Sequence, residues 1–125
     1  MAITSTNWAS AQRRSTEAPP AEVAGFLQEL LTRRLTAFIG GVDGKTISRW
    51  AASDVSTIRD LNVEQRLRTA YAIARMLLEW SSPQTVRAWF IGLNPHLDDA
   101  SPATALRDGH LQEVAAAARI FIAGG

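Results

Sequence analysis

Residues 33–52 read RRLTAFIGGVDGKTISRWAA and carry the steric pattern of a helix-turn-helix. Ala37 is small where two helices would cross, and Gly41 stands four residues later, where the turn needs a positive φ. Ile47 and Trp50 are three apart on the second helix, so we expect both to face inward. In such a motif the second helix lies in the major groove of DNA. The pattern indicates a DNA-binding module, although any tight corner between two helices shares these features.

The outward side of this second helix and its flanks carry the candidate DNA contacts. Arg49 lies four residues after Lys45 on the same face and can pair with guanine through two hydrogen bonds. Asp43 is suited to cap the helix, but with Gly44 it does not favour phosphate at that end. Residues 33–59 hold five Lys or Arg and two Asp, which predicts weak binding by one copy and stronger binding by two. The predicted DNA-binding residues are Arg33, Arg34, Lys45, Thr46, Ser48 and Arg49.

Composition sets the limits on class and location. The chain has 125 residues, of which 46% are hydrophobic, enough for one domain or for two small helical units that share a core. Its net charge of +1 means that any affinity for nucleic acid must come from a local patch or a dimer. Cysteine is absent, which excludes disulfides and catalytic thiols and fits the cytoplasm. We expect neither a signal peptide nor a membrane-spanning segment.

Helical signals recur along the chain, and no segment alternates in the manner of a strand. Residues 1–18 are polar and mixed, and we interpret them as a flexible tail in which Trp8 either packs loosely or contacts a partner. We therefore predict an all-α protein. Helices are predicted to begin after Pro19-Pro20, at Ser82-Pro83 and at Ser101-Pro102, and to run from Asn62 through Trp80 and from His110 to about Ile122. On the helix that begins at Asn62, the charged side chains are expected to be solvated: Arg66, Arg68, Arg75 and Glu79.

Residues that could support catalysis are few. His96 and His110 are the only histidines, and the one conceivable metal site would combine His96 with Asp98 and Asp99. Consecutive aspartates before a helix more often solvate a turn and favour the helix dipole. The chain lacks nucleophile-elbow and phosphate-loop spacing. We expect no enzymatic activity, no metal and no cofactor.

The C-terminal part, residues 88–125, reads AWFIGLNPHLDDASPATALRDGHLQEVAAAARIFIAGG. It combines an Ala-Trp pair, a Leu, a Pro that opens a short helix, a Leu before Asp-Gly, and a final amphipathic helix that ends in Gly. This pattern resembles the toxin-binding domain of Xre–MbcA–ParS antitoxins, and the upstream helix-turn-helix looks like their Xre-type module. Asn94-Pro95 inverts the Pro-Asn turn of the family, so the loop geometry is expected to differ. The matching positions are Ala88, Trp89, Leu97, Pro102, Leu106, Asp108, Gly109, Val114 and Gly124.

The resemblance implies a function and its partners. Antitoxins of this family bind and block a RES-domain toxin that destroys NAD, repress their own operon by binding operator DNA, and form homodimers or larger toxin–antitoxin assemblies. Trp is enriched both in cores and at interfaces, so Trp89, Phe90 and Leu97 can serve as core anchors or as partner anchors. Phe121 and Ile122 are the best candidates for an apolar docking patch. The predicted partner-binding residues are Trp89, Leu97, Leu106, Phe121, Ile122 and Gly124.

The predicted organisation is therefore an Xre-like helix-turn-helix unit over residues 19–61 and a helical toxin-binding domain over residues 62–125, behind the tail of residues 1–18. The leading hypothesis is an antitoxin that neutralises a RES-domain toxin and represses its own operon. The alternative is a stand-alone DNA-binding transcription regulator with no toxin partner. A third hypothesis is a protein-interaction module that has lost DNA binding.

Overall fold

The computed structural model describes residues 3–52 and 57–124, with side chains described from Trp8 onward. Over these ranges the chain is all-helical and contains no strand, which confirms the predicted fold class. No helix in this part of the chain is both long enough and apolar enough to span a bilayer. The helices are α1 (Ile3–Glu17), α2 (Pro20–Leu31), α3 (Arg33–Gly40), α4 (Gly44–Ala52), α5 (Leu61–Leu78), α6 (Pro83–Ile91), the 3₁₀ helix η1 (Pro95–Leu97), α7 (Pro102–Arg107) and α8 (Leu111–Ile122).

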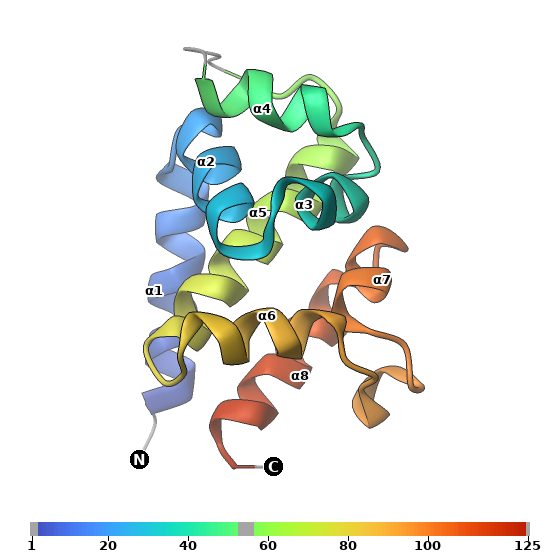
Figure 1. The fold of residues 1–125 in the computed structure, drawn as a ribbon. Coiled ribbons are helices and arrows are strands. Elements are labelled where there is room, and N and C mark those ends of the chain that lie inside the picture. The colour runs from blue at the N-terminus through green and yellow to red at the C-terminus, as the bar shows by residue number, and fades with distance from the viewer. Residues whose placement is uncertain (1–2, 53–56, 125) are drawn as a thin grey trace.

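Helix α5 runs through the middle of the molecule, and the other helices pack around it (Figure 1). Half of its residues, nine of eighteen, are buried, because its apolar side chains are not confined to one stripe. One continuous cluster of buried side chains reaches from α1 to α8. Helix α4 lies at one end of the molecule, and both ends of the chain lie at the opposite end (Figure 1).

Local capping signals explain several helix starts. The hydroxyl oxygens of Ser82 and Ser101 accept hydrogen bonds from the backbone N–H groups of Thr85 (3.2 Å) and Thr104 (3.1 Å), and a proline follows each serine. Both predicted starts are confirmed. The start of α5 lies slightly earlier than expected, because Asp60, not Asn62, caps it by accepting from the N–H groups of residues 62 and 63.

Residues 3–17 form helix α1, where the sequence predicts a flexible tail over residues 1–18; residues 1 and 2 of that prediction lie outside the described residues. Ala11 and Ser15 are buried, and the Ser15 hydroxyl donates to the Arg68 carbonyl on α5 at 2.6 Å. Trp8 is half-buried against the core, with the Arg119 guanidinium of α8 5.5 Å from its ring centroid. The prediction was wrong because α1 is held by docking onto α5, and its own sequence has little apolar periodicity.

The sequence predicts that the arginines of α5 are solvated, but in the structure they contact neighbouring helices. Arg66 donates to the Gly40 carbonyl at the end of α3 at 2.6 Å, and Arg68 donates to the carbonyls that end α1. The Arg75 guanidinium lies over the ring of Phe26 on α2, 4.1 Å from its centroid. Each of these arginines therefore ties a neighbouring helix to the central one.

Candidate nucleic-acid interface

A tight turn of residues 41–43 joins α3 to α4. Gly41 adopts a left-handed conformation with φ of 74°, as the sequence predicts. Its N–H donates to the Phe38 carbonyl (3.2 Å), and the Val42 N–H donates to the Ala37 carbonyl (3.1 Å). These two bonds form a Schellman motif, which satisfies the last carbonyls of α3 and turns the chain sharply. The corner thus has a local cause in the sequence.

Two distant arginines complete the C-terminal end of α3. Arg66 of α5 donates to the Gly40 carbonyl, and Arg107, at the end of α7, donates to the Phe38 carbonyl at 3.0 Å. Positive charge at a helix C-terminus is favourable because the exposed carbonyls carry partial negative charge. Neither contact has a local signal in the sequence, since the two contacts join residues 26 and 69 positions apart.

We expect Gly41→Ala to lower the free energy of unfolding by about 1–2 kcal/mol, because a Cβ is strained in the left-handed region. The added Cβ would also lie 3.2 Å from an Arg66 nitrogen. Chemical denaturation measures the effect. Gly25→Ala in α2 is the matched control, since its Cβ would meet Ala51 at an ordinary 3.9 Å and should not destabilise the fold. Equal stability of the two variants would contradict the strained turn.

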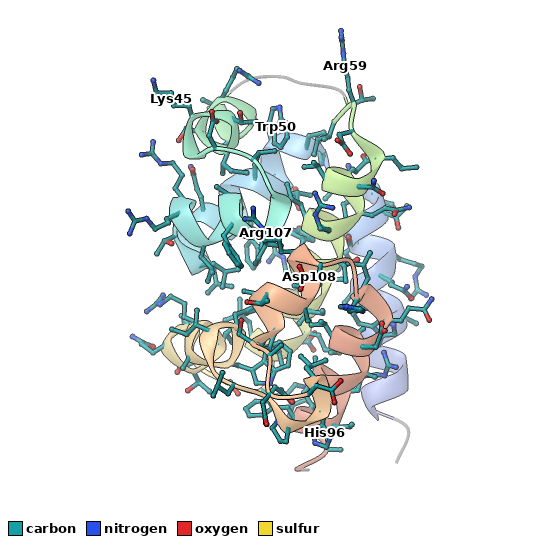
Figure 2. The ribbon with its side chains drawn as sticks, turned by 90° about the vertical axis from the view of Figure 1, so that its right-hand side faces the viewer. Lys45, Trp50, Arg59, His96, Arg107 and Asp108 are labelled. Atoms are coloured by element: carbon teal, nitrogen blue, oxygen red, sulfur yellow. The ribbon has the colours of Figure 1, made fainter. Side chains whose placement is uncertain are left out.

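Helix α4 has a buried face and an exposed face. Ile47 is fully buried and Trp50 is half-buried against the core, so both face inward as the sequence predicts. Lys45 and Arg49 are exposed on the other side. Figure 2 shows Lys45 and Arg59 extending from the same end of the molecule, whereas Trp50 lies on the body side of α4. The end of the molecule formed by α4 therefore presents basic side chains to solvent.

Asp43 caps α4 and accepts hydrogen bonds from Thr46, one of the predicted DNA-binding residues. Its carboxylate accepts from the Thr46 hydroxyl (2.7 Å) and from the Thr46 N–H (2.8 Å). These bonds hold the pKa of the Asp43 carboxyl below its ordinary value of 3.8, and the bond from the Thr46 hydroxyl has the larger effect. The capping contribution is therefore present above pH 3.8 and is lost as pH falls through the lower folded-state pKa. At neutral pH the start of α4 is occupied by a carboxylate, so phosphate contacts must come from elsewhere.

The remaining predicted DNA contacts do not form one surface. Ser48 accepts a hydrogen bond from Arg33 at 3.3 Å, and the Arg33 side chain lies against Gly44, so this pair fills the junction of α3 and α4. Arg34 lines a groove between α3, α6 and α7. Thr46, Ser48 and Arg33 are thus engaged in hydrogen bonds within the chain, and Arg34 lies in a separate groove, while DNA binding by these six residues stays a prediction. Lys45 and Arg49 remain on the outward face of α4.

The predicted partner-binding residues also divide into two groups. Leu106 is fully buried and Leu97 is 8% exposed, so both are core residues of this fold and not a contact surface. Trp89 and Ile122 are half-buried, and Phe121 is 39% exposed, with its ring centroid 6.3 Å from that of Trp89. Gly124 is exposed with φ of 87°. Trp89, Phe121 and Ile122 therefore form the candidate partner patch on α6 and α8.

The histidines and carboxylates of the described residues do not gather into a group of three or more that could hold a metal ion. His96 lies at the end of the molecule far from α4 (Figure 2). Comparison with family models, curated proteins and solved structures finds no match to this chain.

Proposed function

We propose that α3 and α4 form a helix-turn-helix and that α4 is its recognition helix, which inserts into the major groove of DNA. One observation carries the proposal: the α3–α4 corner buries Ile47 while it leaves Lys45 and Arg49 exposed at one end of the molecule. Arg59 extends from the same end and adds a phosphate contact beside the groove. The function is sequence-specific DNA binding, and its target is operator DNA upstream of the chain's own gene.

Two substitutions test this assignment by gel shift or fluorescence anisotropy. Arg49→Ala should weaken binding to the operator by about 1–3 kcal/mol and relax specificity at one base pair. Lys45→Ala should weaken binding to all sequences alike and lower the salt dependence by about one unit of slope. Arg13→Ala on α1 is the matched control, because it removes one positive charge from a helix remote from α4. Unchanged affinity in both α4 variants would show that this helix does not contact DNA.

We further propose that the chain is the antitoxin of a RES-domain toxin, with residues of α6 and α8 as the toxin-binding surface. Support comes from the resemblance of residues 88–125 to that domain and from the partly exposed aromatic pair of Trp89 and Phe121. Aromatic side chains at such patches are common anchors of protein interfaces. The pair lies on different helices from α4, so one molecule can hold toxin and DNA together.

Co-expression with a RES-domain protein encoded next to this chain tests the antitoxin role. The wild-type chain should restore growth, and Phe121→Asp should lose most of the rescue, because it places a charge in an apolar contact. Gln112→Asp, on the exposed side of α8, should rescue as wild type does. If the wild-type chain does not rescue growth but binds its operator, the stand-alone regulator is the correct alternative.

A further inference from the structure

An apolar groove of about 540 Å³ lies between α3, α6 and α7. Its apolar lining grades from buried to exposed side chains: Leu31 and Ala103 are buried, Leu35 is half-buried, and Phe38 and Ile91 are 38% and 62% exposed. A contiguous apolar surface that is open to solvent marks a site of interaction, and a volume of this size is typical of small-ligand sites. The groove therefore offers a ligand an apolar bed outside the surfaces assigned above.

The positive charge of the groove is concentrated at one end. Arg34 and Arg87 line it, and no carboxylate among the described residues does. Arg34 lies one helical turn before Phe38 on α3, and Arg87 lies one turn before Ile91 on α6. Arg87 donates to the Leu30 carbonyl at 3.1 Å, which holds its guanidinium near the junction of α2 and α3. The groove thus has a basic end at that junction and an apolar end beyond it.

The hydroxyl groups of the lining are engaged within the chain. The Ser101 and Thr104 hydroxyls are hydrogen-bonded to each other at 2.9 Å, and the Thr32 hydroxyl accepts from the backbone N–H three residues later at 3.2 Å. Arg34, by contrast, makes no hydrogen bond or ion pair with another described residue. A ligand with many polar groups would leave them unpaired here, whereas one anionic group on an apolar body would complement the surface.

We propose that this groove binds a fatty carboxylate, whose alkyl chain lies along Leu35, Phe38 and Ile91 and whose carboxylate pairs with Arg34. A guanidinium can hold a carboxylate through two parallel hydrogen bonds, and Arg87 adds positive charge at the same end. The eight residues of α3 span about 12 Å, which suits an extended chain of about ten carbons. None of the lining residues belongs to α4 or to the patch of Trp89, Phe121 and Ile122, so the site is separate from both.

Isothermal titration calorimetry of the full chain with decanoate, below its micelle concentration, tests the site. We expect saturable binding of one decanoate per chain. The uncharged 1-decanol should bind at least about tenfold more weakly, because it cannot form a charged pair with the guanidinium. Octanoate should bind about five- to tenfold more weakly than decanoate, since it buries two fewer CH₂ groups. No saturable binding of decanoate, or equal binding of decanoate and decanol, overturns the proposal.

Two variants locate the ligand in the groove. Arg34→Gln should weaken decanoate binding at least about fivefold and leave decanol binding as in the wild type, because it removes only the charged pair. Ile91→Asp should weaken the binding of both ligands, because it places a carboxylate beside the alkyl chain. The matched controls are Arg13→Gln on α1 and Leu61→Asp on α5, where the leucine is 62% exposed like Ile91, and both should bind decanoate as the wild type does.

Thermal denaturation without ligand shows whether each variant is folded before it is titrated. All titrations are made without DNA, so their outcome does not depend on the DNA-binding assignment. If folded Arg34→Gln and Ile91→Asp both bind decanoate as tightly as the wild type, the ligand lies elsewhere and the assignment of the groove is wrong.

Discussion

Leu67→Ala is expected to lower the free energy of unfolding by about 2–5 kcal/mol, the range for removing a fully buried leucine and leaving a cavity. Leu67 has no exposed surface and sits on the side of α5 that faces the end of α3. A Cβ built on Gly40 would lie 3.3 Å from a Leu67 methyl carbon, so glycine is what lets the two helices approach this closely. The cavity would open beneath the α3–α4 corner, and we expect reduced order in α4 as well as lower stability.

Urea denaturation measures the loss of stability, and hydrogen exchange of the amides of residues 44–52 measures the effect on α4. Leu61→Ala is the matched control, because it removes the same atoms from the same helix at a position that is 62% exposed. Its effect should stay within about 0.5 kcal/mol. If the two leucine variants unfold at the same denaturant concentration, Leu67 does not support the corner.

The features that the sequence predicted correctly have short-range causes. Gly41, the Ser82 and Ser101 caps and the inward side of α4 depend on residues within about one helical turn of each other. Glycine in the left-handed region and serine at an N-cap act through the nearest backbone groups, so a single sequence carries the whole signal. The all-α class follows from the same local patterns.

The features that the sequence missed depend on contacts between distant residues. Nothing in residues 3–17 marks them as helical in isolation, because α1 is polar and only its docking on α5 selects the helix. The roles of Arg66 and Arg107 depend on where α5 and α7 meet α3, which no local pattern encodes. Packing between distant segments therefore decides both that α1 is helical and that the last carbonyls of α3 accept hydrogen bonds from Arg66 and Arg107.

The candidate DNA-binding site was predicted in part for the same reason. Spacing alone placed Lys45 and Arg49 on one face of α4, and the structure has both exposed. Spacing could not show that Thr46 is engaged by Asp43, that Ser48 is engaged by Arg33, or that Arg34 turns toward α6 and α7. Hydroxyl and guanidinium groups form bonds wherever a partner is in reach, so their availability depends on the neighbouring helix.

Arg68→Ala is expected to lower the free energy of unfolding by about 2–4 kcal/mol, through the loss of the anchor that holds α1. One Arg68 nitrogen donates to the carbonyls of both Ser15 and Ala18, at the end of α1. The Ser15 carbonyl has no helical partner of its own, because the residue four positions on is Pro19, which lacks an N–H. Removing the guanidinium leaves two part-buried carbonyls unsatisfied, at roughly 1–3 kcal/mol each.

Hydrogen exchange of the α1 amides, measured beside urea denaturation, separates local from global loss. We expect the amides of α1 to exchange faster in Arg68→Ala. The protection free energy of the slowest amides of α5 should fall by no more than the loss of global stability. The stability of Arg68→Lys should fall between those of the wild type and Arg68→Ala, because lysine keeps the charge but loses the rigid guanidinium, whose Nε–H also donates to Glu64. Arg14→Ala, an exposed arginine in the last turn of α1 itself, controls for the charge at that helix end. Unchanged exchange of α1 in Arg68→Ala would show that the docking of this helix does not depend on the Arg68 hydrogen bonds.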